Sequence, residues 1–404
     1  MRKCGRVLYD TYRRMKSFVL YYSNNYNAST SSEELRGNEQ AKQTRCNPFE
    51  LHINLWKIKN GVLRVKSDLV FDFGVKFDSE IAKLCLFLPF KVSRTIPVKD
   101  LGEGMSRNRD LLNAVFNEDM ICQSSTNHCF SRIEKNDSPT DESKNEMFYI
   151  YHLGASNVVR EDYKEGSEVK GTYLKINING APSNKENSKS GEKYYIRFRI
   201  YVEDVNEVVH TKILSNDLLQ AAFSRTDLYD IRLNEKREIP SKVDEKMNNE
   251  GYALCKFSKI HFFYIADTDE TINNGIDIRK DSRLLEKDQW MGYEPQCNIE
   301  GINYIAHHWK KDREKSFSHF SLFFSTIYPK VSSIRLLAYL TVVVLLSWLG
   351  SMLSFSIIEL FKFGIWVDWI CPILIVILVL FLLIYIFKSN FVLPKIRNYH
   401  PIHD

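Results

Sequence analysis

Recognisable catalytic motifs are missing from this sequence. It contains no P-loop, GxSxG nucleophile elbow, HExxH zinc motif, dinucleotide-binding glycine fingerprint or protein-kinase signature. The glycines at 102 and 104 form too short a turn to cradle a phosphate, and no lysine follows them. These absences favour a binding or signalling protein over an enzyme. An enzyme whose site is assembled from dispersed residues is the alternative, because it would leave no such motif.

Paired cysteines are missing too. The eight cysteines are scattered, and none forms a CxxC pair: Cys4, Cys46, Cys85, Cys122, Cys129, Cys255, Cys297 and Cys371. Neither His128 with its neighbouring cysteines nor the pair His307 and His308 has further ligands at the spacing of a zinc site. The pattern fits neither a disulfide framework nor a structural metal site, so we expect no cofactor and a reducing compartment.

Excess charge of either sign is missing from most of the chain. The sequence has 55 Lys and Arg and 50 Asp and Glu, but ten of these bases and five of these acids follow residue 306. Residues 1–306 therefore carry no net charge. Since a nucleic-acid-binding domain normally carries its excess positive charge on the folded part, we expect no binding to duplex nucleic acid.

Long apolar runs, in contrast, are present near the C-terminus. Residues 336–358 contain no charged side chain, and neither do residues 369–387. The charged residues of this region lie in the connector between the two runs. Each run is close to the ~20 residues that cross a ~30 Å hydrocarbon core as a helix. The two runs predict a hairpin of two transmembrane helices joined by a connector at 359–368, so that the lipid bilayer is one partner of the protein.

Basic residues predict the orientation of this hairpin. The connector holds one lysine, whereas six basic residues lie between 310 and 335 and three follow the second helix. The positive-inside rule places both termini, including the 388–404 tail, in the cytoplasm, with the hairpin in the inner or plasma membrane.

The first apolar run has small residues four positions apart. These residues are Ser347, Gly350, Ser351 and Ser354. Such spacing lets helix backbones approach closely in lipid. It predicts packing either against the second helix of the hairpin or against the same helix of another protomer.

The segments on either side of the folded domain have distinct patterns. Residues 1–26 predict a basic amphipathic helix that lies on the membrane surface or packs on the protein, and 27–47 read as a flexible linker. The apolar side chains between 317 and 327, within the juxtamembrane segment 309–335, predict an interfacial helix.

Residues 48–308 predict an α+β fold that is mostly antiparallel β-sheet. Apolar and polar residues alternate from 51 to 55 and from 69 to 77, and a further strand is expected at 84–90. Polar stretches at 134–145, 182–192 and 234–249 read as surface loops. Five more strands are expected at 148–153, 171–178, 194–202, 228–233 and 255–266.

A weak internal repeat suggests how this domain is divided. Residues 110–117 and 217–224 share five identities in eight positions, and each segment follows an aromatic-rich strand. Either two similar lobes (48–146 and 147–308) arose by duplication, with a cleft between them, or two common amphipathic helices converged by chance.

The strand at 194–202 carries the best candidate ligand surface. Tyr195, Arg197, Arg199 and Tyr201 alternate with apolar residues. If this face points outward, it either is ordinary solvated surface or binds a small anionic or nucleotide ligand by stacking and ion pairing. Asp68 and Asp72 are likewise expected on a solvated face.

Together these patterns predict a cytoplasmic sensing or binding protein anchored in the membrane. One specific version is a bacterial defence or stress effector whose hairpin oligomerises and perturbs the membrane. That version rests on architecture alone.

Overall fold

A computed structural model of the chain describes residues 17–24, 47–58, 69–96, 98–127, 129–136, 147–178, 192–212, 224–274, 281–290, 293, 303–329, 333–362 and 377. The chain divides into two compact units. The first comprises Met1–Ile213 and Arg225–Tyr328 and is called the β-body below. The second comprises Leu214–Ser224 and Pro329–Asp404 and contains helix α7 (Ser333–Lys362).

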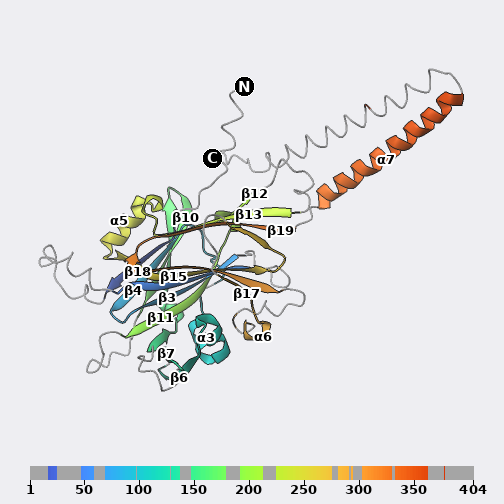
Figure 1. Ribbon diagram of the computed structural model, residues 1–404. Helices are drawn as coiled ribbons and strands as arrows, with labels where there is room; N and C mark the ends of the chain where they lie inside the picture. The colour runs from blue at the N-terminus through green and yellow to red at the C-terminus, as the bar shows by residue number, and fades with distance from the viewer. Residues whose placement is uncertain are drawn as a thin grey trace, which may run out of the picture. The chain divides into compact units, whose positions relative to one another are not determined.

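The described strands form three sheets (Figure 1), which confirms the expectation of a mostly antiparallel β-fold. The largest sheet has ten strands, in which β5 pairs with β11 beside the path β17-β18-β15-β2-β3-β11-β8-β7-β6. Their bounds are β2 (Phe49–Lys57), β3 (Leu69–Asp78), β5 (Lys99–Asp100), β6 (Met120–Asn127), β7 (Phe130–Lys135), β8 (Met147–Tyr151), β11 (Lys193–Tyr201), β15 (Phe257–Asp267), β17 (Asp281–Leu284) and β18 (Tyr304–Phe317).

Two smaller sheets complete the β-structure. The five-stranded sheet has the order β14 (Ala253–Leu254), β1 (Val19–Asn24), β4 (Ile81–Leu88), β10 (Glu168–Asn177) and β9 (Val158–Glu165). The four-stranded sheet has the order β12 (Val209–Lys212), β13 (Ser224–Leu233), β19 (Phe320–Pro329) and β16 (Thr271–Asn274). Short 3-10 turns lie at Ala155–Asn157, Val205–Glu207 and Lys236–Glu238.

The main hydrophobic core lies between the ten-stranded sheet and the two smaller sheets. The alternating apolar face of β3, with Phe71 and Phe73, packs with β11 residues such as Phe198 and with Leu86 of β4. Tyr229 of β13 is part of the same core. Because side chains alternate along a strand, this packing leaves the second face of β3 and β11 to be covered by something else.

Three helices lie over the second face of the ten-stranded sheet: α2 (Gly102–Arg107), α3 (Arg109–Phe116) and α6 (Lys287–Trp290). Leu111 and Leu112 of α3 are buried in a second apolar cluster with Trp56 of β2. Each leucine buried in this way stabilises the fold by about 1.5–3 kcal/mol. The Asn108 side chain caps the start of α3 by accepting from the Leu111 amide.

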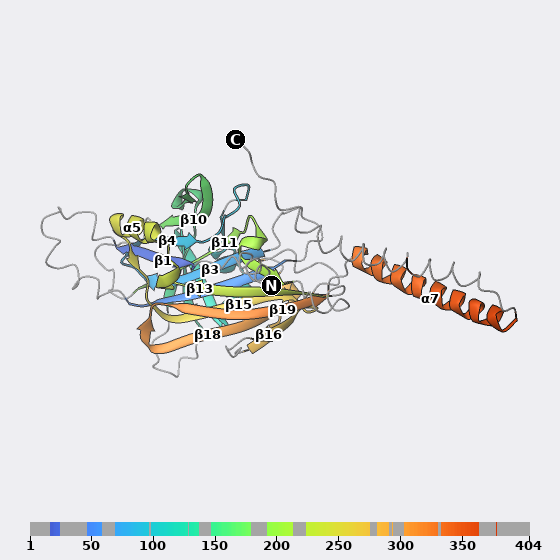
Figure 2. The same cartoon turned by 90° about the horizontal axis from the view of Figure 1, so that it is seen from above.

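Helix α5 (Ser241–Asn249) covers the outer face of the five-stranded sheet. Its buried Val243 and Met247 pack with Tyr21 of β1 and Phe87 of β4 in a third cluster. Seen from above, α5 lies beside β1 and β4 (Figure 2). The β-body is thus layered as helix, small sheets, large sheet and helices.

The structure corrects four of the expectations for this part of the chain. Residues 19–24 are strand β1 rather than part of an N-terminal helix, while 1–16 lie outside the described residues. The expected interfacial helix at 317–327 is instead β18 and β19, and the expected loop at 234–249 contains α5. Strands from both expected lobes pair with one another, as β3 does with β11 and β2 with β15, so the sheets do not follow a boundary at 146.

Helix α7 includes the whole of the first apolar run, residues 336–358. A search of the described residues finds no helix that is long and apolar enough to span a membrane. The predicted connector at 359–368 is helical as far as Lys362, and its residues 363–368 lie outside the described residues. The second predicted membrane helix also lies outside them, apart from residue 377. So does the second copy of the internal repeat, except Ser224.

Candidate functional site

A chain of buried and half-buried polar side chains crosses the second face of the ten-stranded sheet, and we call it the polar network. Its members come from β2, β3, β11, β15 and β18, with one tyrosine from the segment after α6: Glu50, His52, Trp56, Asp72, Tyr195, Arg197, Arg199, His261, Tyr293 and His308. Arg197 and Arg199 are each 1% exposed, and Asp72 is fully buried. Such burial of charged groups requires that they be paired.

The inner end of the polar network is an ion pair between β11 and β3. Arg199 donates from Nε to Asp72 Oδ1 at 2.6 Å and from its terminal nitrogen to Oδ2 at 2.9 Å. Trp56 Nε1 and the Tyr293 hydroxyl also donate to Oδ2, each at 2.7 Å. Four hydrogen bonds therefore compensate the carboxylate for the loss of its water.

Arg197 links this ion pair to the histidines. Its Nε donates to the Tyr293 hydroxyl at 2.8 Å, and its NH1 donates to the Tyr195 hydroxyl at 2.8 Å. Gly74 on β3 makes room for this arrangement, because a Cβ atom at that position would lie 2.1 Å from the Tyr195 hydroxyl oxygen. The Tyr195 hydroxyl in turn donates to His52 Nδ1 at 3.3 Å.

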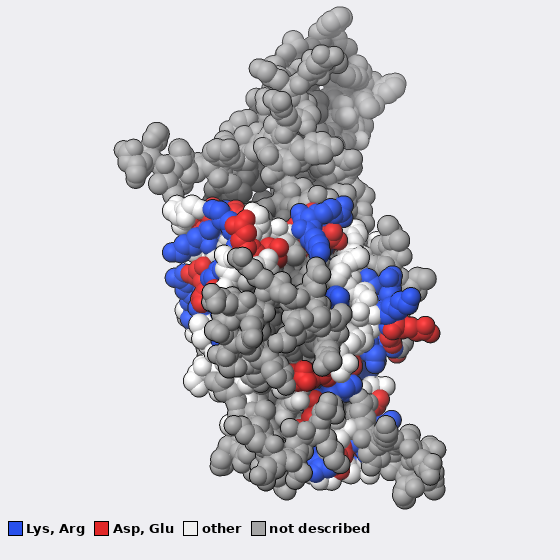
Figure 3. Space-filling view, turned by 90° about the vertical axis from the view of Figure 1, so that its left-hand side faces the viewer, with Lys and Arg blue, Asp and Glu red and all other residues white. Residues whose placement is uncertain are grey.

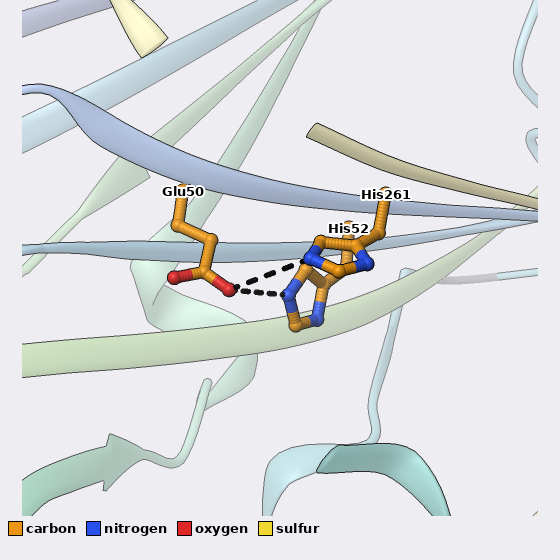
Figure 4. Close-up of side chains that lie close together, drawn as sticks. All are labelled: Glu50, His52 and His261. Carbon is orange, nitrogen blue, oxygen red and sulfur yellow. Dashed lines mark hydrogen bonds and ion pairs between the residues drawn. The ribbon is translucent and has the colours of Figure 1, made fainter. Parts of the chain in front are cut away.

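The outer end of the polar network is a cluster of one carboxylate and three imidazoles. His52 Nε2 donates to Glu50 Oε1 at 3.1 Å, and His261 Nε2 lies 3.9 Å from the same oxygen. Figure 4 shows the Glu50 carboxylate turned toward both rings. His261 Nδ1 is hydrogen-bonded to His308 Nε2 at 3.0 Å, and the rings of Phe263 and His308 stack. Glu50 and His261 remain partly exposed, so this end of the polar network is reached by solvent.

Burial sets the charge state of this cluster. It lowers the pKa of His52 below the ordinary value for histidine. Burial, with His52 and His308 close by, lowers the pKa of His261 to about 3. For Glu50 burial acts in the opposite direction, but the hydrogen bond from His52 and the ammonium groups of Lys259 and Lys76 hold its pKa below the usual range. At neutral pH Glu50 is thus a carboxylate anion beside the neutral imidazoles of His52 and His261.

A small cavity adjoins the polar network. It is lined in part by His52, Asn54, Arg197 and Trp290 and has room for about one or two water molecules. Among the described residues, neither the buried Asn54 side-chain oxygen nor the buried Trp290 Nε1 has a hydrogen-bond partner. An acceptor and a donor therefore remain unsatisfied in two residues of the cavity wall.

The sequence-predicted ligand residues lie in the interior rather than on an outward face. Tyr195, Arg197 and Arg199 are buried and bonded within the polar network, and Tyr201 at the end of β11 is half-buried. Asp72 is buried as well, while Asp68 lies outside the described residues. The expectation of a solvated face was wrong because α2, α3 and α6 lie over it. A nucleotide cannot stack on these side chains without opening that layer.

Among the other residues considered from sequence, His308 belongs to the polar network, whereas His307, Cys122 and Cys129 do not. His307 and His308 are neighbouring residues of β18, and His307 Nδ1 is hydrogen-bonded to the Ser282 hydroxyl at 2.9 Å. Cys122 is half-buried and Cys129 exposed, while His128 lies outside the described residues.

Five members of the polar network were not predicted from sequence: Glu50, His52, Trp56, His261 and Tyr293. Glu50 and His52 are two residues apart on β2, so the sequence could have predicted that they share one face of the strand. Their juxtaposition with His261 depends on the parallel pairing of β2 with β15, in which His52 lies opposite His261. A parallel pairing between strands about two hundred residues apart leaves no local signal in the sequence.

The described surface carries both signs of charge. On the face shown in Figure 3, basic and acidic side chains are interspersed. The described part of this face therefore shows no single-signed patch for a polyanion. Comparison with known proteins adds no family: no family model matches the chain, and no curated protein matches it.

Proposed function

We propose that this chain is a membrane-anchored sensing or binding protein, with its β-body in the cytoplasm and its C-terminal helices in the bilayer. The observation that carries the proposal is helix α7, which runs for 30 residues and carries exposed apolar side chains. Among those side chains are Leu337, Val344, Leu346 and Phe355, of which Phe355 is 67% exposed. A continuous apolar helix surface of this kind calls for an apolar partner.

The polar residues of α7 suit a lipid environment. The hydroxyls of Ser347, Ser351 and Ser354 donate to the carbonyl oxygens of Val343, Ser347 and Gly350, at 2.9–3.0 Å. Bonding within the helix removes the cost of placing these hydroxyls in hydrocarbon. The structure describes the α7 side chains at 337 and 339–355. The uncharged stretch of sequence that the proposal places in the bilayer is longer, from 336 to 358.

The anchor is tested by charged substitutions in the full chain. Val344→Arg with Leu346→Arg places two charges near the middle of the proposed span, each costing about 2.5–3.5 kcal/mol on an insertion scale. We expect the unsubstituted chain and a Val344→Ile, Leu346→Ile control to stay in membranes washed with alkaline carbonate, and the arginine variant to be released. Release of the unsubstituted chain would rule out the anchor.

Self-association through α7 is part of the same proposal and supports the idea of a defence or stress effector. Gly350 and the three serines give the small surface that close helix packing needs. Replacing Gly350 by Leu in the full chain should then lower the oligomeric state in detergent and abolish any effect of expression on membrane potential. A monomeric unsubstituted chain would remove the effector idea but leave the anchor untouched.

A membrane-tethered enzyme is the second candidate. Its support is the cluster of Glu50, His52 and His261, three groups able to bind or transfer protons, beside a cavity. Turnover by the full chain in a screen of hydrolase and transferase substrates, lost in Glu50→Gln, would favour it. A screen without turnover would leave the binding protein as the better account.

A further inference from the structure

We propose that Glu50, His52 and His261 bind a divalent first-row transition metal ion, with Zn²⁺ as the reference ion. This site goes beyond the proposed anchoring, and either idea can fail without the other. Two imidazoles and one carboxylate form a donor set that suits Zn²⁺ and its neighbours in the first transition row. Oxygen-only ions such as Mg²⁺ and Ca²⁺ prefer a different donor set.

The distances between the ligand atoms fit such an ion. Glu50 Oε1 lies 3.1 Å from His52 Nε2 and 3.9 Å from His261 Nε2, and one ligand atom from each residue falls within 4.8 Å of the others. Donors at about 2.0–2.2 Å from a tetrahedral or octahedral ion stand roughly 3–3.5 Å from each other. Binding therefore needs side-chain adjustments of about an ångström or less, and no movement of a strand.

The backbone already holds the three ligands on one side of the sheet. Glu50 and His52 are alternate residues of β2, and His261 lies opposite His52 in the parallel pair with β15. Both strands are interior strands of the ten-stranded sheet. Ligands on paired interior strands keep their separation better than ligands on loops do.

Hydrogen-bonding partners hold the two imidazoles on their far sides. His261 Nδ1 bonds to His308 Nε2 at 3.0 Å, which turns His261 Nε2 toward Glu50. His52 Nδ1 faces the Tyr195 hydroxyl at 3.3 Å. When Nε2 of His52 binds the ion, its proton is lost from Nε2 and Nδ1 carries the ring proton, with the tyrosine oxygen as its acceptor. Such outer partners orient histidine ligands in metal sites.

The surroundings also hold groups that oppose a cation. Lys259 Nζ lies 3.9 Å from Glu50 Oε2, on the carboxylate oxygen that does not face the histidines. The Lys259 ammonium group competes with a bound ion for the negative charge of Glu50 and repels the ion. We therefore expect a lower affinity for the ion than at a site with only anionic neighbours. Three protein ligands leave one or more positions for water or a small ligand, and the partly exposed Glu50 and His261 give the ion a route of entry.

The experiment is Zn²⁺ titration of the full chain in detergent by calorimetry, with Co²⁺ as a spectroscopic substitute. We expect about one ion per chain. His261→Gln and Glu50→Gln should each weaken binding by more than the ~10–100-fold that outer-partner changes cause, and His308→Gln should fall within that ~10–100-fold range. The matched control His210→Gln, on β12 away from the cluster, should bind as the unsubstituted chain does.

Two outcomes would overturn the site: no binding by the unsubstituted chain, or binding that survives unchanged in both His261→Gln and Glu50→Gln. If a variant fails to fold, the unsubstituted chain still decides the matter. Co²⁺ bound by two imidazoles and a carboxylate should give visible bands that Zn²⁺ removes, and a spectrum of fully hydrated Co²⁺ would count against the proposal. Carbonate extraction of membranes from the same cells, before detergent is added, reports separately on the anchor.

Discussion

At the scale of single residues, Arg199 and Asp72 form an ion pair that is buried in the interior of the protein. Both partners are needed for stability, because removing one of them leaves the charge of the other buried without compensation. Arg199→Met should therefore reduce the free energy of unfolding by about 3–5 kcal/mol. Arg237→Met is the matched control, since Arg237 is 85% exposed in its ion pair with Glu235 and should change stability by less than about 1 kcal/mol.

Denaturant unfolding of the two variants measures this difference. Equal stability of the Arg199 and Arg237 variants would mean that Asp72 either is not buried or finds another partner, and the polar network as described would be wrong.

Burial also predicts which cysteines react. It raises the pKa of Cys85 to about 12, so at pH 8 only roughly one molecule in ten thousand carries the reactive thiolate there. We expect iodoacetamide to modify the exposed Cys129 within minutes and to leave Cys85 unmodified in the folded chain. Peptide mass spectrometry measures both sites in one sample, and equal labelling of the two would contradict the burial of β4.

At the scale of elements, the close contact of β3 with β11 depends on Gly74. A methyl group there would meet the Tyr195 hydroxyl, so Gly74→Ala should destabilise the protein by about 1–3 kcal/mol and disturb the hydrogen bond to His52. Gly104→Ala in α2 is the control. Outside the helix backbone and the two neighbouring residues, no atom of the described residues lies within 4 Å of its added methyl group, and alanine should stabilise the helix by about 0.5–1 kcal/mol.

Thermal unfolding of both glycine variants tests this contrast. A Gly74 variant as stable as the Gly104 variant would show that Tyr195 can move away without cost, and the polar network would then be loosely held.

The same two strands show how far sequence reasoning reaches at this scale. Alternation of apolar residues predicted β3 and β11 to within about a residue of their observed bounds. It also predicted that the other face of each strand is solvated, which holds for an antiparallel sheet covered on one side. That inference failed because the helices over β11 come from distant parts of the chain, and period-two patterns carry no information about a second layer.

At the scale of the whole molecule, the candidate site depends on the sheet order. The sequence indicated β2 and β15 as separate strands, but only their parallel pairing brings Glu50 and His52 next to His261. The expected nucleotide surface was lost for the same reason, since its residues became part of the interior. The anchor, in contrast, is a property of contiguous sequence, which is why it could be proposed from two uncharged runs alone.

The central proposal concerns placement: we propose that the β-body lies in the cytoplasm and the C-terminal apolar segments in the membrane. The most direct measurement is labelling of intact cells that express the full chain with Gly364→Cys, using a membrane-impermeant maleimide. We predict that the thiol introduced at position 364 of the connector reacts in intact cells, whereas the exposed Cys129 of the β-body reacts only after the membrane is permeabilised. Labelling of Cys129 in intact cells, or release of the unlabelled chain with the soluble fraction, would contradict this placement.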